Sequence, residues 1–260
     1  MTPYTPGVLG EKFVLPSAKG LKRIYLSWFG IPDVRVQLTG CYLVQVLARL
    51  SFKSILDVGC GNGMLSCLMA SRYPDCSILG IDRSEPGIGF ATRLAEQNGL
   101  RNARFLAGDL ESAELKEKFD VITCLAVLQF INDTASALKK FHDALTPGGY
   151  LVLQLPALTT RAILSSVTTS LRSLPDFHEA RGGFTEDEIR RHLAESGFEI
   201  FTFQNIIKGP TILAKELFYL ASSVHPAATF GLSPLLNWIT VHDRHFGGLA
   251  NGMFVVAKKI

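Results

Sequence analysis

The stretch Ile55-Leu-Asp-Val-Gly-Cys-Gly-Asn-Gly-Met64 decides the fold of this chain. Apolar residues lead into Asp57, glycines alternate through the next positions, and Met64-Leu-Ser-Cys-Leu-Met-Ala70 has apolar residues at helical spacing. This order predicts a strand, a tight turn and a helix. Glycines let the turn backbone approach a ligand, and the helix behind the turn offers free N–H groups. We therefore predict a ligand site at this turn.

The spacing of the glycines narrows the kind of ligand. The dinucleotide fingerprint Gly-x-Gly-x-x-Gly would need its third glycine at Met64. A Walker phosphate loop needs Gly-Lys-Ser/Thr, and no lysine lies between Lys53 and Lys116. The carboxylate of Asp57 suits an ammonium group or ribose hydroxyls better than a pyrophosphate, which it would repel. A nicotinamide-dependent oxidoreductase is therefore the less favoured alternative.

Strands and helices alternate along the rest of the chain. Short apolar runs predict strands at 77–82, 103–107, 119–124, 150–155, 198–203 and 252–257, and amphipathic patterns predict helices at 33–50, 84–98, 133–145, 211–223 and 232–243. A further helix is expected at 17–30. This alternation predicts an α/β fold with a doubly wound parallel sheet, whose ligands lie at the carboxyl ends of the strands.

Four later segments carry a family resemblance, together with the glycine turn. In order, they are Leu79-Gly-Ile-Asp82, Ala107-Gly-Asp-Leu110, Phe119-Asp-Val-Ile-Thr-Cys124 and Leu145-Thr-Pro-Gly-Gly-Tyr150. They resemble the successive motifs of the class I S-adenosylmethionine-dependent methyltransferases, and the resemblance covers residues 50–207. It implies a Rossmann-like sheet of seven strands, mostly parallel with the last strand antiparallel, and S-adenosylmethionine as the cofactor, with S-adenosylhomocysteine as the product.

The resemblance also implies roles for individual residues. Asp57 would hold the amino-acid end of the cofactor, directly or through water, and Asp82 would bind the ribose hydroxyls. Asp109 would accept from the adenine amino group beside Leu110, or else cap the segment that follows. The other residues implied at the cofactor are Gly59, Cys60, Gly61, Gly63, Arg83, Cys124 and Leu125, of which Cys124 is as readily explained by packing.

One departure from the family concerns the general base. Many relatives carry Glu-His after the fourth strand, where this chain has Leu128-Gln129-Phe130. Methyl transfer from a sulfonium can run on positioning and water exclusion, so a base is needed only when the acceptor must lose a proton. His178 is the candidate catalytic base and Gln129 the candidate substrate contact. The missing pair leaves a catalytically silent cofactor-binding regulator as an alternative.

Histidines also occur in His242-Asp-Arg-His245, which is either a polar cluster facing the acceptor or a solvated helix end. We favour the solvated end. No group of residues has the spacing of a metal site, so no metal is expected.

The 260 residues predict a single methyltransferase domain. Its expected parts are an N-terminal helical cap (1–50), the cofactor-binding core (51–207), a helical insertion (208–247) and the final strand (248–260). The cap and the insertion would form an acceptor pocket. The insertion resembles that of bacterial members found with polysaccharide, lipid or quinone biosynthesis, so the predicted reaction is methylation of a small-molecule, lipid-linked or sugar-linked acceptor, with oxygen as the favoured atom.

Composition restricts the partners. A net charge of +3 without a Lys/Arg block, and Leu125-Ala-Val-Leu-Gln129 in place of an Asn/Asp-Pro-Pro-Tyr/Phe element, argue against nucleic acid. Five cysteines without a Cys-x-x-Cys pair indicate a reducing compartment. No apolar run is long enough for a membrane span, and no secretory signal is visible. We expect a cytoplasmic monomer or homodimer that could still contact a membrane peripherally.

Overall fold

The computed structural model describes residues 20–21, 34–112, 115–158, 163, 182–224 and 228–260. The chain forms two compact units. The first, called the helical unit here, comprises residues 1–45, 159–180 and 205–252. The second, the cofactor unit, comprises residues 46–158, 181–204 and 253–260 and contains the glycine turn.

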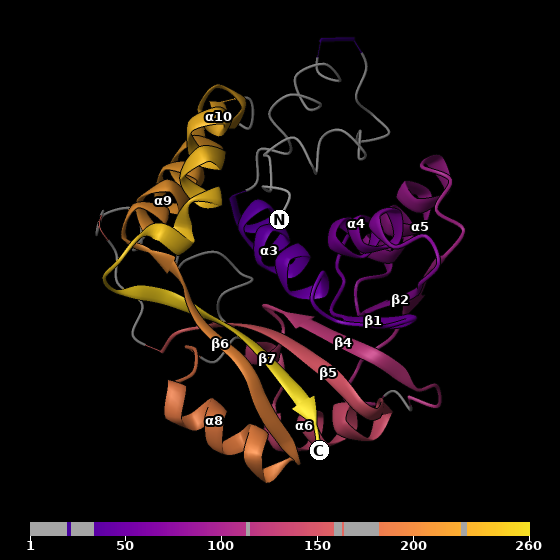
Figure 1. The fold of residues 1–260 in the computed structure, drawn as a ribbon. Coiled ribbons are helices and arrows are strands. Elements are labelled where there is room, and N and C mark those ends of the chain that lie inside the picture. The colour runs from indigo at the N-terminus through magenta and orange to yellow at the C-terminus, as the bar shows by residue number, and fades with distance from the viewer. Residues whose placement is uncertain (1–19, 22–33, 113–114, 159–162, 164–181, 225–227) are drawn as a thin grey trace. The chain divides into compact units, whose positions relative to one another are not determined.

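A seven-stranded sheet has the strand order β3-β2-β1-β4-β5-β7-β6 (Figure 1). β1 (Ser54–Val58) pairs in parallel with β2 (Ser77–Asp82) and β4 (Phe119–Leu125). β2 pairs in parallel with β3 (Ala103–Ala107), and β4 with β5 (Leu145–Pro156). β6 (Phe198–Lys208) and β7 (Ala250–Lys259) complete the sheet, and the last strand is antiparallel. The predicted Rossmann-like fold is confirmed.

The order of the strands reverses between β1 and β4, which is where open parallel sheets bind their ligands. Both strands are almost fully buried, because they lie in the middle of the sheet and are covered on both faces. The main core cluster runs along these strands and includes Leu56, Ile122 and Phe141. The carboxyl ends of β1 and β4 are therefore held on a well-packed base.

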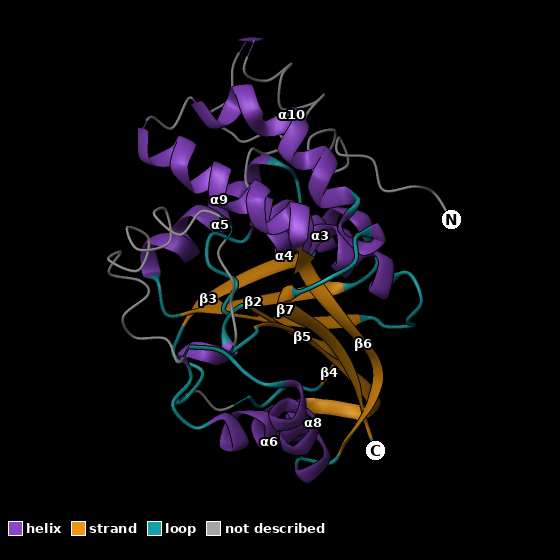
Figure 2. Ribbon diagram, turned by 90° about the vertical axis from the view of Figure 1, so that its left-hand side faces the viewer, coloured by secondary structure: helices purple, strands orange, loops and turns teal. Residues whose placement is uncertain are grey.

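Most helices of the cofactor unit begin with a side-chain cap, whereas the helix after the glycine turn has none. The helices are α4 (Met64–Arg72), α5 (Glu85–Gln97), α6 (Thr134–Ala144) and α8 (Glu186–Glu195), with a short 3-10 helix η1 (Leu128–Phe130). The Ser84 hydroxyl accepts from the N–H of Gly87 at 3.1 Å. Thr185 and Glu188 form a reciprocal capping box. Figure 2 shows α6 and α8 together on one face of the sheet and α4 and α5 on the other.

The helical unit contains α3 (Val34–Leu47), α9 (Gly209–Val224), α10 (Ala228–Val241) and a short 3-10 helix η3 (Asp243–His245). Its small core includes Val34, Ala214 and Leu236. Both helices of the insertion start a few residues earlier than predicted, and α10 contains Pro234. The helix expected at 17–30 lies almost entirely outside the described residues. Within the described part of the chain, no helix has the length and apolarity to cross a membrane.

Candidate functional site

The glycine turn is joined to the end of β2 through its backbone. The N–H groups of Gly59 and Cys60 both donate to the carbonyl oxygen of Ile81, at 2.7 and 3.1 Å. Gly59 has a φ of 67°, and a Cβ there would lie 2.2 Å from Cγ2 of Val127. Glycine is therefore required at this position for both conformation and space.

Gly61 differs from Gly59 because the space beside it is open. Its φ is 55°, yet a Cβ built there meets nothing within 4 Å. Gly63 resembles Gly59, since its Cβ would lie 2.5 Å from that of Ala91. Protein packing thus explains the first and third glycines, and Gly61 is the position where a ligand can approach the turn backbone.

Asp82 stands at the end of β2 and faces this turn. Its Oδ2 accepts from the N–H of Gly61 at 2.7 Å, and its Oδ1 accepts from the N–H of Ser84 at 2.8 Å. The residue is partly exposed. A carboxylate offers about four acceptor sites, so two backbone donors leave it able to accept from a pair of hydroxyl groups.

Asp57, by contrast, is enclosed, with 3% of its surface exposed. Its Oδ2 accepts from the Ser66 hydroxyl at 2.5 Å and its Oδ1 from the Thr123 hydroxyl at 2.6 Å. Burial raises the pKa of Asp57 to about 6 and the charge of Asp82 adds to the rise, although the two hydroxyl donors oppose it. Asp57 ties β1 to α4 and β4, and its contact with the cofactor stays a prediction.

The segment after β3 is closed by its own hydrogen bonds. Asp109 is exposed, and its Oδ1 accepts from the N–H of Glu111 at 2.9 Å. Its carbonyl oxygen accepts from the N–H of Ser112 at 3.2 Å. Lys140 of α6 donates to the carbonyl oxygen of the buried Leu110 at 2.7 Å. These bonds favour the capping role of Asp109, while its predicted adenine contact remains untested.

The carboxyl end of β4 contains a strained residue that the sequence did not reveal. Ala126 has a φ of 59°, in the left-handed region that costs a non-glycine residue roughly 1–2 kcal/mol. Two hydrogen bonds hold it. Its N–H donates to the carbonyl oxygen of Gln154 at 2.9 Å, and its carbonyl oxygen accepts from Nε2 of Gln129 at 2.8 Å.

Gln129 has a second notable feature. Its Oε1 is buried, and it has no hydrogen-bond partner in the part of the chain that the structure describes. A buried acceptor without a donor costs roughly 1–3 kcal/mol. Because Nε2 is engaged with Ala126, the predicted substrate contact of Gln129 would fall on this oxygen, and that contact stays a prediction.

The remaining predicted cofactor residues differ in their surroundings. Cys124 is fully buried, and burial, with a smaller effect from the charge of Asp57, raises the pKa of its thiol to about 12. Packing therefore accounts for Cys124. Cys60 and Leu125 are half-buried, Arg83 is exposed on the loop after β2, and the candidate base His178 lies outside the described residues.

The favoured interpretation of His242–His245 as a solvated helix end is wrong for Asp243, which is completely buried. Its carboxylate accepts from the Tyr42 hydroxyl at 2.9 Å and from the N–H groups of Ile207 and Lys208 at 3.1 and 2.8 Å. Burial and the neighbouring carboxylate raise the pKa of Tyr42. Asp243 therefore links Tyr42 of α3 to residues 207 and 208 within the helical unit.

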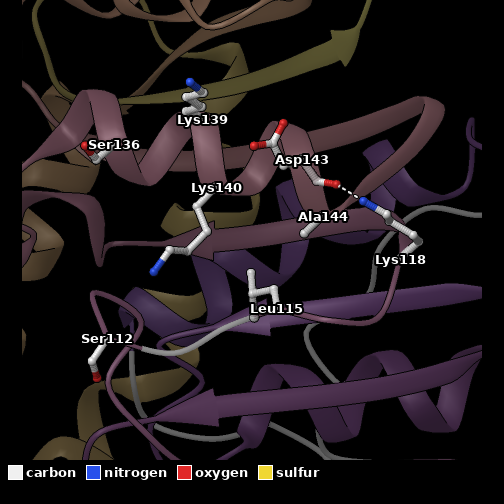
Figure 3. Close-up of a pocket in the computed structure, with 8 residues that line it drawn as sticks. All are labelled: Ser112, Leu115, Lys118, Ser136, Lys139, Lys140, Asp143 and Ala144. Carbon is white, nitrogen blue, oxygen red and sulfur yellow. Dashed lines mark hydrogen bonds between the residues drawn. The ribbon is translucent and has the colours of Figure 1, made fainter.

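A hollow of about 450 Å³ lies beside α6 (Figure 3). The residues that line it come from α6 and from the segment 112–118. Two of its three lysines are engaged, because Lys118 donates to the carbonyl oxygen of Asp143 and Lys140 to that of Leu110. None of the predicted cofactor residues lines it, and no ligand is assigned to it.

Comparison with known proteins decides the family. Residues 51–198, more than half of the chain, match the family model described as a methyltransferase domain. The chain belongs to the class I S-adenosylmethionine-dependent methyltransferases. S-Adenosylmethionine is its cofactor, as predicted. The empty space beside Gly61 and the carboxylate of Asp82, which bonds to the N–H of Gly61, fit a ligand with ribose hydroxyls.

The sequence of this methyltransferase is similar to those of two curated relatives with different substrates in their names. It is 32% identical over 158 residues to the ubiquinone biosynthesis O-methyltransferase of Pseudomonas aeruginosa (strain LESB58), a match covering 59% of this chain and 67% of that protein. It is 30% identical over 199 residues to the trans-aconitate 2-methyltransferase of Deinococcus radiodurans, covering 75% and 71%.

Solved structures show the same fold. The structure of coclaurine N-methyltransferase bound to N-methylheliamine and SAH is similar with a TM-score of 0.60 and 14% identity. The match covers 86% of this chain and 72% of that one. At this identity the likeness concerns the fold alone.

Three residues of the site were missed in the sequence: Ser66, Thr123 and Ala126. Ser66 and Thr123 carried a signal, since each is a single hydroxyl residue inside an apolar run, and a polar side chain in a buried element needs a partner. Ala126 carried none, because alanine is compatible with any element and its positive φ depends on the surrounding bonds.

Proposed function

We propose that this methyltransferase methylates an oxygen atom of a small or lipid-linked acceptor that carries an acidic hydroxyl, such as a phenol. The observation that carries the proposal is the buried Oε1 of Gln129, which is free to accept a hydrogen bond beside the strained Ala126 at the carboxyl end of β4. The name of the P. aeruginosa relative, an O-methyltransferase, supports the same choice of atom.

The chemistry of an amide explains why the acceptor should be acidic. Bound S-adenosylmethionine supplies an electrophilic methyl group on sulfur. The oxygen of Gln129 can orient a hydroxyl group by accepting its hydrogen, but an amide does not take up the proton. A phenol that ionises easily releases its proton to solvent before the methyl group leaves sulfur for the phenolate oxygen. No strong base is then needed, and positioning and exclusion of water suffice. For a less acidic hydroxyl, His178 is the candidate base.

The cofactor unit contributes the other roles in this proposal. Asp82 accepts from the ribose hydroxyls, and the N–H groups around Gly61 approach the cofactor because nothing fills the space beside that residue. Asp57 holds the turn in shape through Ser66 and Thr123. The cap (1–50) and the insertion (208–247) select the acceptor. The composition of these two segments supports this role, because Leu and Phe are frequent among their apolar residues.

The test is transfer of a labelled methyl group to parallel sets of phenols, carboxylic acids, amines and extracted lipids. We expect phenols to be methylated, and Gln129→Ala to lower kcat/KM about tenfold, which corresponds to one hydrogen bond. Asn132→Ala, an exposed residue on the same loop, is the matched control. Transfer to amines alone would refute the choice of oxygen. Binding of S-adenosylhomocysteine without turnover on any set would favour the silent regulator.

The pH profile separates the two routes to a deprotonated acceptor. If the acceptor ionises by itself, the rate follows the pKa of the acceptor, and it changes when one phenol is replaced by a more acidic one. If His178 is the base, the rate falls below the histidine pKa with every acceptor, and His178→Ala removes this limb.

A further inference from the structure

Helix α10 exposes large apolar residues on one side and buries four polar residues, together with Leu236, on the other. Leu232, Leu235 and Trp238 are 38%, 56% and 55% exposed. The polar residues at helical spacing are instead buried: Thr229, Ser233, Asn237 and Thr240. At 100° per residue the two sets occupy opposite faces of the helix. This is the reverse of the arrangement in a helix that covers the core of a globular protein.

Local contacts hold the exposed face in place. The ring of Trp238 lies against that of His242, with centroids 4.6 Å apart, and Nδ1 of His242 is 2.7 Å from the carbonyl oxygen of Trp238. On the buried side, the Thr240 hydroxyl donates to the carbonyl oxygen of Leu236 at 2.9 Å. The contact with His242 therefore fixes the ring of Trp238, and an apolar patch formed with Leu232 and Leu235 would be suited to an interaction site.

The charges of the segment that contains α10 are also distributed unevenly. Between residues 205 and 252 the sequence has two acidic residues, Glu216 and Asp243, and both are buried. Glu216 accepts from the N–H of Ile163 at 3.0 Å. The three basic residues of this segment, Lys208, Lys215 and Arg244, all reach solvent to some extent. The exposed charge of this segment is consequently positive only.

We propose that α10 docks on the surface of an anionic lipid bilayer, with Leu232, Leu235 and Trp238 entering the headgroup region. Tryptophan favours this region because its ring is apolar and its N–H is polar, and each exposed basic residue is attracted to anionic headgroups. α10 has 14 residues, too few to span a bilayer, so the helix lies in the interface.

Vesicle sedimentation of the full chain tests the proposal. We expect binding to phosphatidylcholine vesicles that contain phosphatidylglycerol, and much weaker binding to pure phosphatidylcholine or at high salt. Leu235→Glu and Trp238→Glu should each weaken binding about tenfold, because each places a charge in the apolar contact. Phe201→Glu is the matched control, since Phe201 is 54% exposed on β6 of the cofactor unit. Circular dichroism confirms that each variant is folded.

A second readout locates the contact. The chain has two tryptophans, at positions 28 and 238, so Trp28→Phe leaves Trp238 as the single emitter. We expect a blue shift of its emission with anionic vesicles and quenching by lipids brominated on the acyl chains. Unquenched emission, or unchanged binding of Trp238→Glu, would overturn the proposal. Self-association that Trp238→Glu abolishes, without vesicle binding, would assign the face to a second copy of the chain. Neither assay requires turnover, so a failed methyl-transfer assay leaves the result valid.

Discussion

Helices α6 and α10 show how differently the two units of this methyltransferase are built. α6 buries Leu138 and Phe141 and follows the ordinary rule of an apolar inner face. α10 buries Ser233 and Asn237 and exposes Leu235 and Trp238. The cofactor unit is thus organised by its apolar core. The helical unit holds buried polar groups, among them the completely buried Asp243.

The largest effect is expected where the helical unit depends on a buried charge. Asp243→Ala leaves the Tyr42 hydroxyl and two backbone N–H groups buried without their acceptor, which should cost about 3–5 kcal/mol of unfolding free energy. Urea unfolding measures this loss. His245→Ala changes an exposed residue of the same segment and should be nearly neutral. Equal unfolding free energies of the two variants would show that the helical unit does not depend on its buried carboxylate, and would thus contradict the contrast with the cofactor unit.

In the cofactor unit, packing should limit substitution of Gly59 in the glycine turn but not substitution of Gly61. Gly59→Ala forces a Cβ against Val127 and should cost about 2–4 kcal/mol. Gly61→Ala meets no atom and should cost about 1 kcal/mol, from its positive φ. Thermal unfolding compares the two variants. Val127→Ala should rescue part of the loss in Gly59→Ala and none in Gly61→Ala. Rescue of both would show that the clash is not specific.

Asp57 should make the unfolding free energy of the protein depend on pH, and comparison with Asp57→Asn separates this effect from that of other groups. Its folded-state pKa of about 6 lies above the value of an unfolded aspartate, so the folded state binds the proton more tightly. The stability from this group is present at pH 4 and is lost as the pH rises through 6. Relative to Asp57→Asn, the wild type should lose roughly 1–3 kcal/mol between pH 4 and pH 7. A constant difference in urea unfolding across this range would contradict the burial of the carboxylate.

The smallest effect on stability is expected at Tyr42, which lies at the edge of the Asp243 cluster. Tyr42→Phe removes one of the three hydrogen bonds to Asp243 and should cost about 1 kcal/mol. The two backbone donors remain in place. A loss as large as that of Asp243→Ala, measured by the same urea titration, would mean that the hydroxyl alone maintains the cluster.

The sequence predicted the features that depend on local order. The strands of the cofactor unit and the glycine turn follow from apolar runs and glycines that are close together in the chain. Asp82 was placed at the turn because carboxyl ends of parallel strands share one edge of the sheet.

What could not be predicted depends on residues far apart. Asp57 meets Thr123 only because β1 pairs with β4, and Asp243 meets Tyr42 across some two hundred positions. Periodicity identified α10 as a helix, but it does not say which face is buried, and here the polar face is inside. The positive φ of Ala126 depends on bonds to Gln154 and Gln129.

The most direct test of the account is calorimetric titration with S-adenosylhomocysteine of the wild type, Asp82→Ala and Asp75→Ala. Asp75 is an exposed aspartate in the loop before β2 and serves as the control. The account predicts micromolar binding by the wild type and the control, and about 100-fold weaker binding by Asp82→Ala, from the loss of hydrogen bonds to a charged acceptor. Unchanged binding by a folded Asp82→Ala protein would contradict the assignment of the cofactor site to the glycine turn and the end of β2.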